Sequence, residues 1–318
     1  MRDYSISVIR GISMLCIVLC HIMQYLEWEL AWWFNVGVQI FLCISGYLYG
    51  KKEISQWGEF LKKGFKKILA GYYIVFIPAA VILCFVIGSD SVNQVIMGLL
   101  LNKTLSGGGH LWFVPTILFC YCITVFLSLI FPKREREGKR FIKLGILWIL
   151  GFVVIDLFIP FFNPAWVFCY CLGYYLGRVE DQKVYRRVSV ILCIAALLCN
   201  GCQILCDYVF HVKLPLHSIF CNYSHVLLGA ALFVLLRCVF RNIGERKILR
   251  VSDKYSYEVY LVHQFFILGP MSLMELTQST VLNLLVTFAV IAVAAFVVKK
   301  LTEWIGYYVF SSQKESMN

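Results

Sequence analysis

Charged side chains are scarce in this sequence: Asp, Glu, Lys and Arg make up only 15% of its 318 residues, while 60% are hydrophobic. A soluble domain carries about 25% charged and about 45–50% apolar residues. The shortage of charge therefore excludes an ordinary soluble globule. It favours an all-α integral membrane protein, because long apolar runs in a chain of this kind are read as transmembrane helices.

Acidic residues are scarcer still than basic ones, since 18 Asp and Glu stand against 29 Lys and Arg, for a net charge of +11. In a soluble chain this excess would raise the question of nucleic acid. Here the basic residues gather in alternate loops between apolar runs. We therefore expect a positive cytoplasmic face on a lipid bilayer and no nucleic-acid partner.

The sequence also lacks internal repeats, low-complexity stretches and any linker that would set off a second domain. A cleavable signal peptide is not expected, because the first apolar run begins at Ile6, is too long and has no small-residue cleavage site. We therefore expect one membrane domain over residues 1–310, followed by a short cytoplasmic tail over 311–318.

A disulfide framework is not indicated, although there are 14 cysteines, because nearly all of them lie inside apolar runs. We interpret them as small packing residues. Cys199, Cys202 and Cys206 leave a choice, since their spacing puts them on one helix face. They either pack or form a disulfide or ligand set at the outer face. No second ligand group accompanies them, so the sequence predicts no metal site.

About ten runs are long and apolar enough to cross a bilayer as helices. They cover residues 6–25, 34–50, 68–88, 111–131, 142–160, 165–178, 188–206, 219–240, 255–274 and 281–304. All but three of the 29 Lys and Arg residues fall on one side, at the termini, in every second loop or at the ends of the runs that flank it. The positive-inside rule therefore predicts that both termini lie in the cytoplasm. Residues 89–109 are the longest outer segment, and the three glycines that end it, 107–109, are expected to form a flexible stretch.

Arg10 and His21 are the most informative titratable groups, because such groups inside spans are costly and usually functional. They are eleven residues apart in the first run, which puts them on one helix face, about 16 Å apart along the axis. Arg10 would then be a cation in the cytoplasmic half, and His21 a proton acceptor nearer the outside. This arrangement suits an enzyme that takes a polyanionic donor from inside and an alcohol from outside. The plainer alternatives are snorkelling for Arg10 and a structural hydrogen bond for His21.

Other candidates among the titratable groups in or beside the runs are His110, Asp156, Glu258 and His263. Asp156 is near the outer end of its run and can reach water. Glu258 is about a turn into the ninth run. Its position is explained equally well by pairing with Lys or Arg and by a functional role. The two histidines either pack in the bundle or line a path for the acceptor.

Five segments together resemble the acyltransferase-3 family of bacterial membrane O-acyltransferases over essentially the whole chain. Arg10 and His21 fit the R-x10-H pattern on that family's first helix. The other segments, in chain order, are FLCISGYLYGKK at 41–52, GHLWFVPTILFCY at 109–121, YCLGYYLGR at 170–178 and YSYEVYLVH at 255–263. Five matches in the family's own order make the resemblance specific.

The sequence departs from this family's pattern at two places. After the second helix, the family has an Arg-rich stretch that leads into a proline pair. This chain has Lys66 and Lys67 there, followed by Ala70 and Gly71. Lysine binds phosphate as a point charge, without the two-pronged geometry of arginine. Glu258 also replaces a residue that is usually small.

The resemblance implies transfer of an acyl group, most often acetyl, from acyl-CoA to a hydroxyl of a sugar or another cell-envelope molecule. The expected partners are acyl-CoA, a glycan or lipid-linked sugar, and the bilayer of the cell membrane, which the chain crosses several times. Acetyl-CoA would act as a co-substrate, with no bound cofactor. The family's catalytic histidine and its arginine correspond to His21 and Arg10.

Acyl transfer needs a base for the hydroxyl, a donor for the oxyanion and a holder for the CoA phosphates. His21 is the expected base, because an imidazole suits this task, and Arg10 would orient the thioester or hold a phosphate. The candidate donor-binding residues are Ser45, Lys62, Lys63, Lys66 and Lys67, although the positive-inside rule explains the lysines equally well. The candidates along the acceptor path are His110, Trp112, Tyr257, Glu258 and His263.

Two other functional classes remain open. A transporter or flippase for an envelope precursor would also carry buried Arg and His in many spans. The sequence shows no inverted repeat and few helices broken by Gly or Pro at matched positions, which disfavours that class. A non-catalytic sensor or scaffold is disfavoured because no soluble effector domain is evident.

Overall fold

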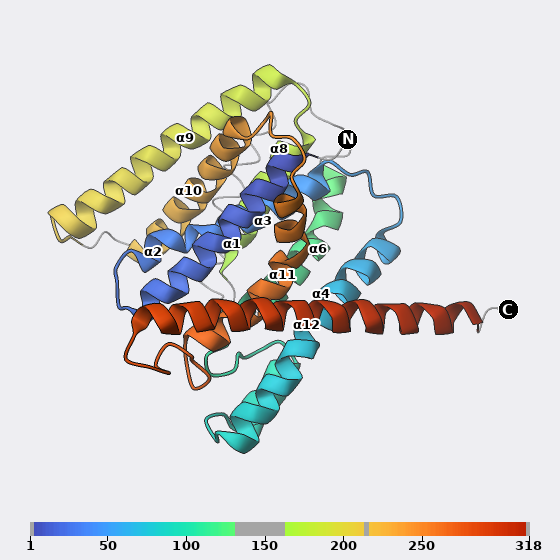
Figure 1. The fold of residues 1–318 in the computed structure, drawn as a ribbon. Coiled ribbons are helices and arrows are strands. Elements are labelled where there is room, and N and C mark those ends of the chain that lie inside the picture. The colour runs from blue at the N-terminus through green and yellow to red at the C-terminus, as the bar shows by residue number, and fades with distance from the viewer. Residues whose placement is uncertain (1–2, 131–162, 213–215, 316–318) are drawn as a thin grey trace. The chain divides into compact units, whose positions relative to one another are not determined.

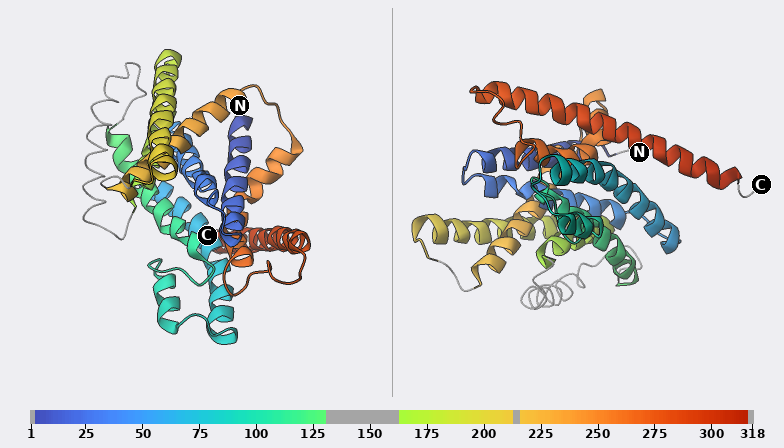
Figure 2. Two further views of the ribbon diagram at one scale, coloured as in Figure 1. Left: turned by 90° about the vertical axis from the view of Figure 1, so that its left-hand side faces the viewer. Right: turned by 90° about the horizontal axis from the view of Figure 1, so that it is seen from below.

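The computed structural model describes residues 3–130, 163–212 and 216–315, and within these ranges it contains helices and turns but no β-strand. Figures 1 and 2 show the helices from three directions. The elements are α1 (Tyr4–Tyr25), α2 (Ala31–Phe34), α3 (Val36–Gly50), α4 (Trp57–Val81), η1 (Ile82–Val86), α5 (Val92–Leu99), η2 (Gly109–Trp112), α6 (Phe113–Ile130), α8 (Pro164–Arg178), α9 (Gln182–Ile204), η3 (Leu205–Val209), α10 (His217–Val239), α11 (Lys247–Ile267) and α12 (Thr280–Glu315). The all-helical fold class is confirmed for these residues.

Seven helices in the described ranges are long and apolar enough to cross a membrane, so the chain is a multi-pass membrane protein. They are Tyr4–Tyr25, Ala31–Gly50, Trp57–Val86, Gly109–Leu129, Gln182–Val209, His217–Val239 and Thr280–Ile305. Each overlaps one of the ten expected runs but has shifted ends; α4, for example, begins at Trp57, well before the run at 68–88.

The other three expected spans are not confirmed. Run 165–178 corresponds to α8, whose 15 residues are fewer than the roughly 20 that a bilayer requires. Run 255–274 corresponds to α11, which begins earlier, at Lys247, and ends at Ile267, before the run does. Run 142–160, with Asp156, lies outside the described residues. The count of ten, the cytoplasmic termini and the boundary at residue 310 therefore stay predictions.

The helices pack into two compact units. The first unit comprises residues 1–17, 32–57 and 119–249, and the second comprises 18–31, 58–118 and 250–318. In the first unit, α3 packs along α8, and α10 packs against α3, α8 and α9. The pair α9 and α10 is visible as two adjacent rods in Figure 1.

Glycines on both helices allow α3 and α8 to approach closely. Gly46 and Gly50 on α3 face the backbone of Tyr170 and Tyr174, while Gly173 on α8 faces the backbone of Cys43. Gly177 likewise faces Tyr47. Each helix thus presents two small residues four positions apart, the spacing that brings membrane helices into backbone contact.

In the second unit, tyrosine hydroxyls connect α4 to its neighbours. Tyr72 donates to the carbonyl of Gly98 at 2.7 Å, and Tyr257 of α11 donates to the carbonyl of Ile68 at 2.8 Å. The ring of Tyr257 lies against Gly71, where a larger residue would collide with it. Gly71 is one of the two residues that replace the family's proline pair, so here this departure makes room for an aromatic contact.

The glycine run 107–109 is packed rather than flexible, contrary to the sequence-based expectation. Gly107 has a φ of +71°, and a side chain there would collide with the carbonyl of Leu268. A side chain at Gly108 would collide with the ring of Phe265. Gly107 and Gly108 are thus required by close contact with residues at and just beyond the end of α11, and they directly precede η2, which carries His110.

Candidate active site

Three histidines from separate elements meet in the second unit: His21 on α1, His110 on η2 and His263 on α11. The ring centroid of His263 lies 4.9 Å from that of His110 and 5.1 Å from that of His21. The His21 and His110 centroids are 6.4 Å apart. His21 and His110 are 89 positions apart in the sequence, and His110 and His263 are 153 positions apart. The three residues nevertheless meet, and we call them the histidine cluster.

Both the backbone and the ring of His110 make polar contacts. Its backbone N–H donates to Oε1 of Gln264 at 2.5 Å, and the same oxygen is 2.7 Å from the ring Nδ1. The ring Nε2 is 3.0 Å from the carbonyl of Leu261, so each ring nitrogen faces an oxygen that can only accept a hydrogen bond. Tyr260 donates its hydroxyl to the His110 carbonyl. With both ring nitrogens engaged, His110 is suited to orient its neighbours rather than to act as the base.

His263 presents a free lone pair to the interior. Its side chain is fully buried, and its Nδ1 lies 2.7 Å from the carbonyl of Tyr260, so Nδ1 carries the proton. Its Nε2 is therefore the unprotonated nitrogen of the neutral ring. Among the described residues this atom has no hydrogen-bond partner. Buried polar atoms are normally paired, so His263 Nε2 is available to accept a proton or a hydrogen bond.

His21 is the most accessible member of the histidine cluster. It is half-buried, and its Nδ1 lies 2.7 Å from Oε1 of Gln24, an exposed residue one turn further along α1. A proton on Nδ1 would leave Nε2 as an acceptor, and the Gln24 amide would hold the ring in that orientation. Of the three histidines, His21 thus combines a fixed orientation with access to a substrate.

Arg10 lies on the same continuous helix as His21, as the sequence predicts, and is half-buried. It belongs to the first compact unit, whereas the histidine cluster belongs to the second. A cavity shared by the guanidinium and the imidazole therefore stays a prediction.

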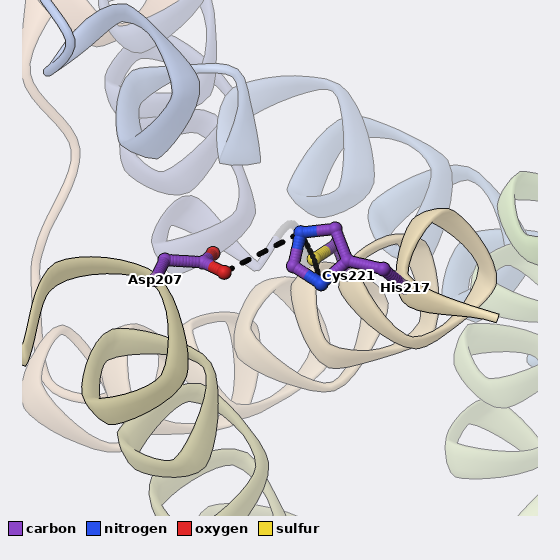
Figure 3. A group of neighbouring side chains, drawn as sticks. All are labelled: Asp207, His217 and Cys221. Carbon is purple, nitrogen blue, oxygen red and sulfur yellow. Dashed lines mark hydrogen bonds and ion pairs between the residues drawn. The ribbon is translucent and has the colours of Figure 1, made fainter. Parts of the chain in front are cut away.

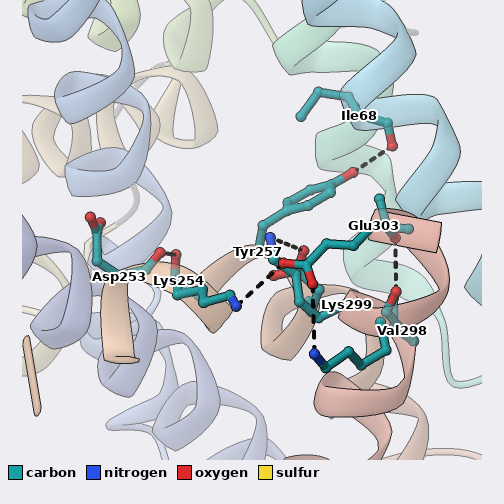
Figure 4. A network of polar contacts seen from close by, with 11 residues as sticks. Ile68, Asp253, Lys254, Tyr257, Val298, Lys299 and Glu303 are labelled. Carbon is teal, nitrogen blue, oxygen red and sulfur yellow. Dashed lines mark hydrogen bonds and ion pairs between the residues drawn. The ribbon is translucent and has the colours of Figure 1, made fainter. Parts of the chain in front are cut away.

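The remaining acceptor-path candidates make contacts of their own. Figure 4 shows the Tyr257 hydroxyl directed at the Ile68 carbonyl, and Lys299 nearby on α12. Lys299 Nζ lies 3.0 Å from Oε1 of Glu258, which is the pairing that the sequence left open. Trp112 is half-buried at the end of η2, and its carbonyl accepts from Thr116 at 3.1 Å. The role of these residues in an acceptor path stays a prediction.

The candidate donor residues divide between the two units. Lys62, Lys63 and Lys67 are exposed on α4 and Lys66 is half-buried, with Lys63 paired to Glu59 at 3.2 Å. Ser45 lies in the first unit, where its hydroxyl donates to the carbonyl of Phe41 one turn earlier. Four lysines on one stretch of α4, three of them exposed, could attract phosphate, and donor binding by these residues stays a prediction.

The sequence did not single out Gln24, Tyr260 or Gln264, which orient the three imidazoles. Tyr260 lies inside the YSYEVYLVH segment and Gln264 directly follows the segment, one helical turn after Tyr260. That spacing puts them on one helix face, which is the signal that could have identified them.

A family model described as an acyltransferase domain, acyltransferase 3, matches residues 3–299, nearly the whole chain. No curated protein and no solved structure matches the chain. The matched range contains all three histidines and Arg10.

Proposed function

This chain belongs to the acyltransferase-3 family, and we propose that it transfers an acyl group, acetyl in the first place, from acyl-CoA to a hydroxyl of a cell-envelope glycan or lipid-linked sugar. The observation that carries the proposal is the histidine cluster, in which two oriented rings and one accessible ring lie within 6.4 Å of one another. Family membership supports a membrane acyltransferase; the acetyl group, the CoA donor, the glycan acceptor and the cell membrane as location belong to the proposal.

In the proposed reaction, His21 accepts the proton of the acceptor hydroxyl as its oxygen attacks the thioester carbonyl. The new C–O bond forms, the C–S bond breaks, and the departing CoA thiolate takes up a proton. A general base of this kind contributes about 10²–10⁴-fold to the rate. His263 Nε2, buried beside the His21 ring, is a second acceptor that could receive the proton or hold the ring. Direct transfer is favoured, because no Ser-His-Asp arrangement is evident in the sequence.

Arg10 and the α4 lysines would bind the donor's phosphates and thioester. Guanidinium and ammonium groups form charge-assisted hydrogen bonds with phosphate oxygens, and the lysines lie together on the part of α4 that the charge pattern assigns to the cytoplasm. Acyl-CoA is made in the cytoplasm, so this placement fits a donor that enters from inside.

A purified, bilayer-reconstituted protein supplied with acyl-labelled acetyl-CoA and a mixture of hexoses and N-acetylhexosamines tests the proposal. We expect free CoA to appear together with label in an ester that mild alkali releases. A transporter or flippase would leave the acetyl-CoA intact, and that result with a correctly folded protein would overturn the proposed function.

A further inference from the structure

Asp207, His217 and Cys221 gather in the first unit where α9 ends and α10 begins (Figure 3). The possible ligand atoms of these three residues all lie within 4.8 Å of one another. The side chains of Asp207 and His217 are 25% and 28% exposed, and Cys221 is buried. The group is thus open on one side and backed by protein on the other.

The distances around one nitrogen match a tetrahedral metal site. His217 Nε2 lies 3.4 Å from Asp207 Oδ1 and 3.5 Å from Cys221 Sγ. With zinc bonds of about 2.0–2.1 Å to nitrogen and oxygen and about 2.3 Å to sulfur, tetrahedral angles put such ligands about 3.4 Å and about 3.6 Å apart. We propose that Asp207, His217 and Cys221 form a binding site for a divalent transition metal of the zinc class.

The chemistry of the three donors supports this assignment. Imidazole nitrogen, thiolate sulfur and carboxylate oxygen are the ligand types that zinc takes in proteins. The Asp207 carboxylate and a Cys221 thiolate neutralise the two charges of the ion, which lowers the cost of holding it beside an apolar span. Cys221 would release its proton to solvent as the metal binds, and water would occupy the fourth position.

Local structure explains how the ligands come together. His217 and Cys221 are four residues apart on the first turns of α10, so both side chains lie on one face. Asp207 lies in the π-helical turn η3 that ends α9, and such turns are frequent at functional sites. A bound ion would therefore tie the end of one candidate span to the start of the next.

The three proposed ligands differ from the cysteines that the sequence left open as a possible ligand set. Cys199, Cys202 and Cys206 share one helix face, but none of the three is in this group, which takes its cysteine from α10. Spacing along α9 could not reveal the pairing, because the ligands come from two helices and the site depends on how their ends meet.

Cobalt binding tests the site without reference to activity. The full chain in detergent, stripped of metal, is titrated with Co²⁺ and then with Zn²⁺. We expect about one equivalent to bind, a thiolate-to-cobalt charge-transfer band, and displacement of cobalt by zinc. Cys221→Ser should abolish that band, and His217→Ala should weaken binding by at least about 10-fold. Asp207→Asn should weaken binding while the circular dichroism of the helices stays unchanged.

His211→Ala and Cys238→Ser are matched controls, since both replace exposed residues that lie outside the group. Both should bind cobalt as the unmodified chain does. The proposal is overturned if the unmodified, folded chain shows no thiolate-to-cobalt band. It is also overturned if the band survives in Cys221→Ser, because the thiolate would then belong to another cysteine.

Discussion

Glu258, a candidate for the acceptor path, forms the ion pair that the sequence left open as the alternative. Its side chain is 4% exposed, and Oε1 is 3.0 Å from Lys299 Nζ. Its second oxygen, Oε2, is buried without a partner among the described residues. A buried carboxylate with one cationic partner depends strongly on that partner, because breaking the pair leaves an uncompensated charge.

Lys299→Ala should therefore destabilise the protein by about 3–5 kcal/mol. Thermal unfolding in detergent, followed by circular dichroism, measures the loss. Lys254→Ala is the matched control, because its partner Glu303 is 44% exposed and exposed pairs contribute less than about 1 kcal/mol. Equal losses in the two variants would contradict the assignment of Glu258 and Lys299 as a buried pair.

Part of the candidate site could be predicted from individual residues in the sequence. Helical periodicity was sufficient to put Arg10 and His21 on one helix, and α1 is continuous over both. Periodicity could not show that His110 and His263 meet His21, because that contact depends on how three elements pack. Nor could it show that the backbone carbonyl of Tyr260 places the ring proton of His263 on Nδ1.

At the scale of elements, the motif segments around Ser45 and at 170–178 have a packing role. Their glycines, Gly46 with Gly50 and Gly173 with Gly177, face the backbone of the opposite helix. In the sequence, these segments carry part of the family resemblance, and Ser45 is a candidate donor-binding residue. The small-residue spacing was present in the printed sequence, but only the pairing of α3 with α8 gives it this meaning.

Gly173→Ala should push α3 and α8 apart, because the added methyl group would meet the backbone of Cys43. We expect a loss of about 1–3 kcal/mol, as for other overpacked interiors, seen as a lower unfolding temperature in detergent. Gly201→Ala on α9 is the control, because open space surrounds that position. There the alanine should be neutral or stabilising by about 0.5–1 kcal/mol. Loss of stability in Gly201→Ala alone would be contrary to this account of the helix contact.

At the scale of the whole molecule, composition was the most reliable guide. The low share of charge predicted a multi-pass membrane protein, and the seven candidate spans confirm that class. The exact number of spans was less predictable, because α8 is short and buried and α11 carries charges along its first turns. The hydropathy of a helix depends on its composition alone, whereas its burial against other helices decides whether it contacts lipid.

The charge pattern predicts that both termini and every basic loop lie in the cytoplasm. A reporter active only in the cytoplasm should therefore be active when fused after residue 318. A reporter active only outside should be active when fused after Lys103, in a segment nearly free of basic residues. An externally located C-terminus would invalidate the topology and the inward-facing donor site derived from it.

The central claim is that His21 serves as the base for acyl transfer within the histidine cluster. Its most direct test is the rate of label transfer from acetyl-CoA by the reconstituted protein, compared among the unmodified chain, His21→Ala and His211→Ala, which alters an exposed histidine outside the cluster. We predict that His21→Ala inserts and accumulates normally but transfers label about 10²–10⁴-fold more slowly, while His211→Ala is unaffected. An undiminished rate in His21→Ala would contradict the account.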